Sequence, residues 1–175
     1  SFRARLSVNF DGAPSVKLSE YSGYIQKSIW GASLQVILPT GQYDDSKLIN
    51  LGSNRITLKP QLGFSSKKGN WIFESYCSLW LFTSNSNFFS GNLKQQRPLV
   101  AFKQHFIHTF KNKTWLTLDA GFGFGGRTLI NGEVTDSRIS TFRFGSVYVL
   151  PLARSHSLRF SLTSGVRLEK GPDFN

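Results

Sequence analysis

Apolar and polar residues alternate along most of the chain, in about eight segments separated by polar connections. The alternation is clearest near the C-terminus, where apolar positions alternate with polar, small or basic ones: Leu158, Phe160, Leu162 and Val166 against Arg159, Ser161, Thr163, Gly165 and Arg167. Side chains of a β-strand point to opposite faces with this period of two. The pattern therefore predicts strands with one apolar face and one polar face.

The length of the segments separates two kinds of β-protein. The segments centre on residues 2–10, 30–38, 55–64, 71–82, 98–110, 116–125, 142–145 and 158–167. Several reach about ten residues, as strands of transmembrane barrels do, whereas strands of soluble proteins average about five or six. We therefore expect one all-β domain over residues 1–175, an antiparallel transmembrane β-barrel. About eight strands would lie in this chain, within a barrel of about ten to twelve.

The connections alternate between short and long. The short ones are residues 67–70, 111–113 and 152–155, and the long polar ones are residues 39–53, 83–97 and 126–137. Outer-membrane barrels have short periplasmic turns and longer outer loops, because successive strands end at opposite faces of the membrane. The rhythm predicts this orientation.

Residues 11–28 break the rhythm, because they lie on the short-turn side and are too long for a turn. Leu18, Tyr21 and Ile25 have helical spacing. We expect a periplasmic-side insertion, either a short helix at the barrel base or in the lumen, or a loop against the inner leaflet.

Large aromatic residues recur at one predicted depth. Trp30, Trp71 and Trp115 begin strands that follow connections on the periplasmic side, and Tyr148 ends a strand at the same level. Amphipathic rings collect at the boundary between lipid and water. These four residues are predicted to be membrane-interface aromatics.

Composition narrows the functional classes. The net charge of +11 could favour nucleic acid, but the cations are spread singly through the strands, so we expect no nucleic-acid partner. No apolar run approaches the roughly 20 residues of a membrane-spanning helix. Cys77 is the only cysteine, which excludes a disulfide within the chain. The first residues carry no signal region and the last ones form no closing strand, so we expect a chain without its signal peptide and its final strand or strands.

Charged residues fall on the polar face of the predicted strands. The set is Arg3, Arg5, Arg55, Lys59, Lys103, Arg143, Arg159 and Arg167, with Glu74 and Asp119 as the main carboxylates. A charge facing lipid would cost about 2–4 kcal/mol near the midplane, so these side chains are predicted to line the lumen. They can form an anion-preferring path, for example for carboxylated aromatic compounds, or a salt-bridge ladder that stiffens a narrow barrel. Both interpretations can hold together.

Other candidate sites are weaker. Gly121, Gly123 and Gly125 lie on one strand face and either bend the sheet or open the lumen; no phosphate-loop sequence follows them. His105, His108 and His156 lie toward the inner end, which is the wrong end for hydrolysis of outer-leaflet lipids. We expect no catalytic residues, metal site or cofactor.

Two outer loops carry further candidates. The adjacent carboxylates of Asp44 and Asp45, beside Tyr43, are suitable ligands for a divalent cation but are too few to define a site. Phe88 and Phe89 could present an apolar surface to a substrate at the mouth or anchor the loop in the outer headgroup layer.

Residues 31–44, with the sequence GASLQVILPTGQYD, and residues 51–55, with LGSNR, carry a resemblance to a known family. Further matches are residues 80–85, 88–89, 125–128, 156–158 and 164–165. The chain resembles, over roughly its whole length, the family named for the MetA pathway of phenol degradation, whose members are outer-membrane β-barrels of transporter type. The resemblance implies that fold and location. Family members usually continue into a final strand beyond a pair like Asp173-Phe174.

The sequence thus predicts a passive outer-membrane channel for small, aromatic or hydrophobic molecules, in contact with outer-membrane lipids and a permeant that can be anionic. A non-transport barrel, either structural, adhesive or lipid-modifying, is the second hypothesis. A soluble ligand-binding barrel is the third, and it requires the apolar faces to point inward.

Overall fold

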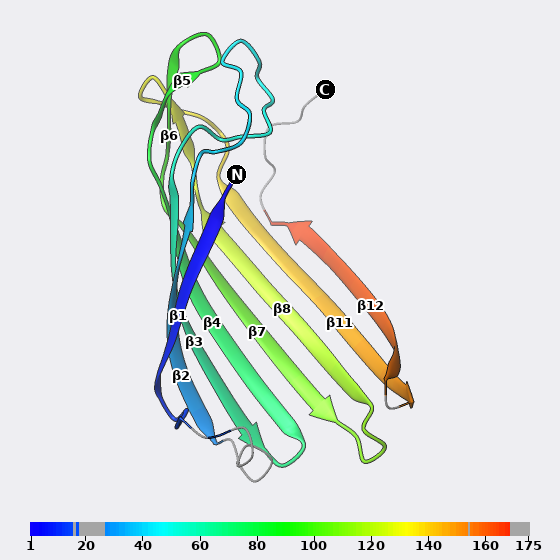
Figure 1. Ribbon diagram of the computed structural model, residues 1–175. Helices are drawn as coiled ribbons and strands as arrows, with labels where there is room; N and C mark the ends of the chain where they lie inside the picture. Colours follow the sequence, from blue (N-terminus) through cyan, green and yellow to red (C-terminus); the bar gives the residue numbers. More distant parts are fainter. Residues whose placement is uncertain (16, 18–26, 154, 169–175) are drawn as a thin grey trace.

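The computed structural model describes residues 1–15, 17, 27–153 and 155–168. Eight long strands form one curved sheet in the order β1-β2-β3-β4-β7-β8-β11-β12, and every neighbouring pair is antiparallel (Figure 1). The strands are β1 (Arg3–Asp11), β2 (Ser28–Ile37), β3 (Thr57–Lys68), β4 (Trp71–Phe82), β7 (Leu99–Thr109), β8 (Trp115–Gly125), β11 (Ile139–Ala153) and β12 (His156–Arg167). The prediction of an all-β antiparallel protein is confirmed. The sheet is not closed, because β1 and β12 are each paired on one side only.

The register gives the sheet two chemically distinct faces. Directly paired residues lie on the same face, so Lys103, Gly121, Arg143 and Gly165 form one row across β7, β8, β11 and β12. We call this the polar face; it also includes Arg5, Gln35, Lys59, Ser78, Glu74, His105 and Asp119. The residues between them form the apolar face, which includes Leu6, Leu34, Leu62, Phe102, Phe122, Phe142 and Val166.

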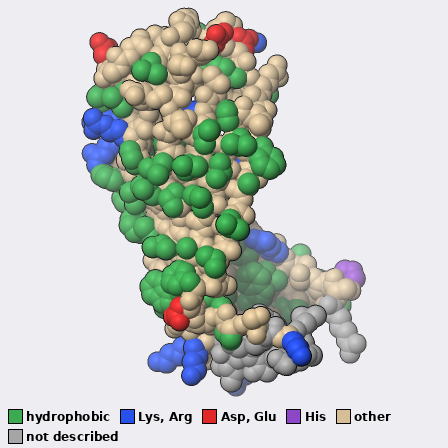
Figure 2. Space-filling model, turned by 60° about the vertical axis from the view of Figure 1, so that its left-hand side comes forward, with side chains coloured by type: hydrophobic (Ala, Val, Ile, Leu, Met, Phe, Trp, Pro, Cys, Tyr) green, Lys and Arg blue, Asp and Glu red, His purple; other side chains and the backbone are tan. Residues whose placement is uncertain are grey.

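The apolar face is open to the surroundings. Leu6, Leu62 and Leu162 are 78%, 56% and 64% exposed, and Figure 2 shows hydrophobic side chains over much of the outer surface. Within the described ranges, Val149 is the only buried apolar side chain. A soluble ligand-binding barrel would bury these faces, so the structure contradicts that third hypothesis.

Contacts between aromatic rings run along the apolar face. Trp30 lies against Phe64 with ring centroids 4.6 Å apart, and Phe73 lies against Phe106 at 5.2 Å. Such cross-strand pairs contribute about 0.5–1.5 kcal/mol each beyond the area they bury. The sheet is therefore held by its backbone ladder and by pairs on its surface rather than by an interior core.

Two long connections contain strands of their own. The second sheet consists of β5 (Asn85–Phe88), β6 (Asn92–Gln96), β9 (Thr128–Ile130) and β10 (Glu133–Val134), in the order β10-β9-β6-β5. The sequence predicted long polar loops over 83–97 and 126–137, and this detail is corrected. These strands have only two to five residues, too few for a periodic pattern to emerge. Asn131 and Gly132, with φ of 51° and 84°, form the turn between β9 and β10, and Asn-Gly is a hairpin signal that was available in the sequence.

The remaining connections follow the predicted alternation. β3 and β4 are joined by Gly69 and Asn70, and β7 and β8 by residues 110–114, at one end of the sheet. The second sheet and the connection between β2 and β3 lie at the other end (Figure 1). Leu18, Tyr21 and Ile25, on which the expectation of a short helix rests, lie outside the described residues. In the described part of the chain, no helix is long and apolar enough to cross a membrane.

Candidate functional site

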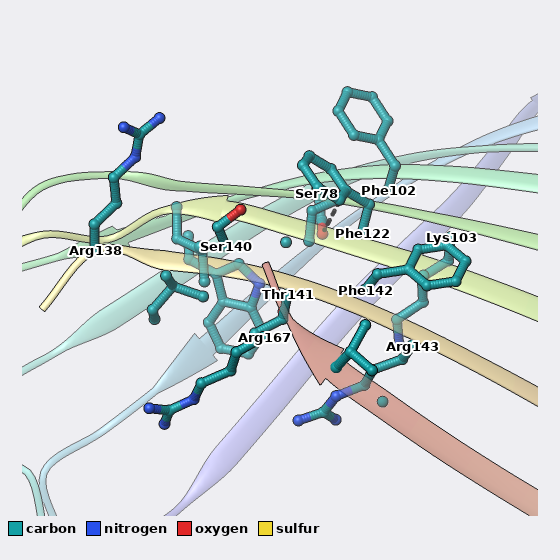
Figure 3. A pocket seen from close by; sticks show the side chains of 18 of the residues that line it. Ser78, Phe102, Lys103, Phe122, Arg138, Ser140, Thr141, Phe142, Arg143 and Arg167 are labelled. Carbon is teal, nitrogen blue, oxygen red and sulfur yellow. Dashed lines mark hydrogen bonds between the residues drawn. The ribbon is translucent and has the colours of Figure 1, made fainter. Parts of the chain in front are cut away.

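The polar face lines a hollow of about 960 Å³ that extends from β3 and β4 to β12. Five basic residues line it: Lys59, Lys103, Arg138, Arg143 and Arg167. In Figure 3, Arg143 and Arg167 extend to one side of the sheet, whereas Phe102 and Phe122 extend to the other. A basic concave surface therefore lies behind an apolar convex one.

Glycines make room for the basic side chains. Gly121 is paired with both Lys103 and Arg143, and Gly165 is paired with Arg143 on its other side. A Cβ atom at Gly165 would lie 3.0 Å from Cγ of Arg143, so the guanidinium arm passes closely over this glycine. Gly121 and Gly123 both line the hollow. The glycines of β8 thus leave open volume in the hollow.

The cations of the polar face are not neutralised by carboxylates. Among the described residues, the ion pairs are Lys47–Asp44 and His105–Asp119, and none of the eight predicted lumen cations takes part. Arg5 Nη2 instead donates to Ser33 Oγ at 3.0 Å, and Arg159 Nε donates to Ser161 Oγ at 3.3 Å. No salt-bridge ladder is formed among the described residues.

The two carboxylates of the polar face have other partners. Asp119 Oδ1 lies 2.5 Å from His105 Nδ1, and Glu74 Oε2 accepts a hydrogen bond of 3.0 Å from Tyr76 Oη. Glu74, His105 and Asp119 are aligned across β4, β7 and β8. We call these three residues the acidic row, and the neighbouring row with Lys103 and Arg143 the basic row. The carboxylates of the acidic row have their own hydrogen-bond donors, and the cations of the basic row form no ion pair among the described residues.

Arg55, which was predicted to line the lumen, does not line the hollow. It precedes β3, its guanidinium stacks 4.4 Å from the ring centroid of Phe82, and Nη2 donates to Gln96 of the second sheet. Burial lowers the pKa of Arg55 from its ordinary value. Lys94 lies 4.2 Å from the Phe88 ring, and burial, followed by repulsion from Arg55, lowers the pKa of Lys94. Residues of the second sheet therefore contact two cations that do not line the hollow.

Comparison with known proteins identifies the family. The family model described as "Putative MetA-pathway of phenol degradation" matches residues 25–150. The chain belongs to this family. Among solved structures, the COG4313 outer membrane channel from Pseudomonas putida F1 has a similar fold, with a TM-score of 0.78 and 20% sequence identity. The match covers 97% of this chain and 60% of that channel, so the chain spans 60% of its length. No curated protein sequence matches.

In this member of the MetA-pathway family, Asn85, which lies in one of the segments that carry the family resemblance, has an architectural role. Asn85 is 2% exposed; its amide donates to Tyr43 Oη at 2.8 Å and to the Ser53 carbonyl at 3.4 Å. Its Oδ1 accepts from Asn54 Nδ2 and from the Asn87 backbone, both at 3.0 Å. Asn85 therefore connects the segment between β2 and β3 to the second sheet through hydrogen bonds. Sequence reasoning missed it, because an asparagine among Ser and Asn residues carries no signal of burial.

The hypothesis of a cation site at Asp44 and Asp45 finds no support. The Asp44 carboxylate accepts hydrogen bonds from the Ser46 hydroxyl at 2.6 Å and the Ser46 amide at 3.1 Å, and it pairs with Lys47 at 3.2 Å. These contacts, the Ser46 hydroxyl first, lower the pKa of Asp44. Within the described ranges, no three His, Cys, Asp or Glu side chains gather as metal ligands would. Asp44 caps a turn of the loop.

Three of the four predicted interface aromatics share one face. Trp30, Trp71 and Tyr148 lie on the apolar face and are 43%, 54% and 39% exposed. Trp115 is paired with Thr109 and Val149, on the face that carries Asp119. Its assignment to the lipid side is therefore corrected. The signal was present in the sequence, because Trp115 shares the parity of Thr117 and Asp119.

The histidines occupy three unrelated positions. His105 pairs with Asp119 on the polar face, whereas His108 lies on the apolar face between Trp71 and Phe110, with ring centroids 4.3 and 4.6 Å away. His156 begins β12, and its Nδ1 lies 3.0 Å from Ser155 Oγ. The family fold thus disperses these residues.

Proposed function

We propose that the chain forms the wall of an outer-membrane channel, with the polar face toward the lumen and the apolar face toward lipid. The observation that carries this proposal is the opposition of the two faces. On one side of the sheet lies a hollow lined by Lys103, Arg143 and Arg167, which form no ion pair among the described residues, and on the other side lie exposed Leu and Phe side chains. In a bilayer, backbone polar groups must pair within the protein, so only helices and closed barrels span it.

Closure requires partners for β1 and β12, whose outer edges have no neighbour in the described sheet. We propose a barrel of about ten to twelve strands. The short turns would face the periplasm, and the second sheet, with the connection between β2 and β3, would lie outside the cell. The similar fold of a protein described as an outer membrane channel supports this arrangement.

The permeant is proposed to be a small anion with an apolar or aromatic part. Lys103, Arg143 and Arg167 present positive charge to the hollow without forming an ion pair in the described chain, which favours anions in the path. Lys59 Nζ lies 4.8 Å from the centroid of the Trp80 ring, so charge and an aromatic surface occur together. Passage would be passive, set by the width and charge of the lumen.

Planar-bilayer recordings of the full-length protein test this proposal. The wild type should show discrete conductance with anion preference. The double variant Lys103→Gln, Arg143→Gln should lower the anion-to-cation permeability ratio about fourfold, since one charge about 10 Å from an ion in water contributes roughly a factor of two. Lys47→Gln, in the outer loop, is the matched control and should leave the ratio unchanged. A folded barrel without conductance, or an unchanged ratio in the double variant, would contradict the proposal.

A further inference from the structure

We propose that the apolar face holds an anionic phospholipid at the short-turn end of the sheet, with its phosphate at Lys68 and an acyl chain in an aromatic groove. The inference rests on the proposed membrane location, but it concerns a specific lipid site outside the permeation path. Its basis is a groove, a lysine at the rim of that groove, and an excess of positive charge around it.

The groove has a volume of about 450 Å³ and crosses β3, β4 and β7. Its apolar lining comes from Phe64, Trp71, Phe73 and Phe106, and Ser66 lies between them. The rings contact one another: Phe64 and Phe73 have centroids 6.4 Å apart, and Phe73 and Phe106 5.2 Å. The short side chain of Ser66 hydrogen-bonds Ser28 at 3.2 Å and leaves space beside the rings. An extended hydrocarbon chain suits such a surface.

Lys68 gives the groove its polar end. It also lines the groove, and it is directly paired with Trp71 on the apolar face. Trp71 is paired in turn with His108. An ammonium group, an indole and an imidazole therefore form one row at the end of the strands, with the aromatic groove beginning on its side toward the sheet centre. A phospholipid has groups in the matching order: its phosphate would contact the ammonium group, and its acyl chain would lie in the aromatic groove.

Several lysines surround this end of the sheet. Lys67 and Lys68 end β3, Lys111 and Lys113 lie in the turn between β7 and β8, and Lys27 precedes β2. Backbone hydrogen bonds link these places: the Lys67 amide donates to the Lys27 carbonyl at 2.8 Å, and the Thr109 amide donates to the Asn70 carbonyl at 2.9 Å. Figure 2 shows basic side chains below the hydrophobic band at this end.

The charge balance favours an anionic lipid over a zwitterionic one. The turns over 67–70 and 110–114 contain four lysines and no carboxylate. Asp11 ends β1 at the same end, two strands away from Lys68. A lysine near an anionic membrane surface strengthens binding by about 1 kcal/mol, or roughly fivefold. Five lysines within a few strands therefore distinguish phosphatidylglycerol from phosphatidylethanolamine.

Native mass spectrometry of the full-length protein in detergent can measure this preference. We expect phosphatidylglycerol to be retained at least tenfold better than phosphatidylethanolamine. The variant Lys68→Gln should reduce retention of phosphatidylglycerol about fivefold, whereas Lys47→Gln at the opposite end should not change it. Inorganic phosphate at millimolar concentration should not displace the lipid, because the acyl chain contributes to binding. Equal retention of both lipids, displacement by phosphate alone, or a dimer that occupies this face would overturn the proposal.

A second measurement locates the acyl chain. Phosphatidylglycerol with brominated acyl chains quenches tryptophan fluorescence on contact, and Trp71 lines the groove, whereas Trp115 lies at the same end on the polar face. We expect Trp71→Phe to remove a large share of the quenchable fluorescence and Trp115→Phe to preserve it. The reverse result would overturn the site. A conducting channel without lipid preference contradicts only this inference, and lipid binding by a silent barrel contradicts only the proposed channel.

Discussion

The hollow and the second sheet contain the same kinds of residue but use them in opposite ways. In the hollow, Arg143 and Lys103 lie opposite glycines and form no ion pair in the described chain. In the second sheet region, Asn85 makes four hydrogen bonds, and Arg55 is held between Phe82 and Gln96. The Asn85 amide, whose partners lie inside the protein, maintains the shape of this region, whereas the cations of the hollow that form no ion pair remain available to a solute. The partners, rather than the residue type, separate architecture from function.

The largest expected effect concerns the architectural region. Asn85→Ala removes two donors and one acceptor from a buried position, and unsatisfied groups of this kind cost about 1–3 kcal/mol each. We expect a local loss of about 3 kcal/mol, seen as about 100-fold faster hydrogen exchange of amides in residues 41–54 and 85–96. Asn87→Ala, at an exposed neighbour that contacts the loop through its backbone, is the control. Similar exchange rates in both variants would show that the hydrogen bonds of the Asn85 side chain do not maintain the shape of this region.

An intermediate effect is expected when the hollow is narrowed. A Cβ atom at Gly121 would have ordinary contacts, 3.8 Å to the Phe102 carbonyl oxygen and 4.0 Å to Lys103 Cγ, so a side chain fits on the strand. Gly121→Leu should reduce single-channel conductance by about half, because the side chain occupies the path. Ala120→Leu places the same side chain on the apolar face and should leave conductance unchanged. Equal effects of the two variants would mean that the faces are assigned wrongly.

The smallest effect is expected from the acidic row. Asp119→Asn removes one negative charge beside the basic row, so the anion-to-cation permeability ratio should rise about twofold, the opposite sign to Arg143→Gln. Asp45→Asn in the outer loop changes the net charge equally and should have no effect on the ratio. Reversal-potential measurements in a salt gradient give this quantity. An unchanged ratio for Asp119→Asn would place the ion path away from this row.

The main sheet could be predicted from the sequence because alternate residues of a strand face different surroundings, which are water and lipid in the proposed channel. Parity alone separated Arg159 and Arg167 from Phe160 and Val166, and the structure keeps them on opposite faces. The ion-pair and hydrogen-bond partners of each side chain could not be predicted in the same way. Whether Asp119 meets an arginine or His105 depends on the register between strands, which the alternation does not encode. Asn85 and the short strands of the second sheet were missed because their contacts join segments distant in sequence.

The two-residue period of the eight-stranded sheet limits how the gene can change. Deletion of a single codon at the start of β8 would move Leu118 to the polar face and Asp119 to the apolar face, and it would reverse the other residues of β8 that follow the deletion. Two-codon changes preserve the sides and alter only the height of the wall. Insertions between β2 and β3, or between β8 and β11, leave the alternation of the wall intact. Related sequences should therefore differ in length mainly in these connections. Substitutions that change the preferred permeant should lie mainly at the alternate positions that form the polar face.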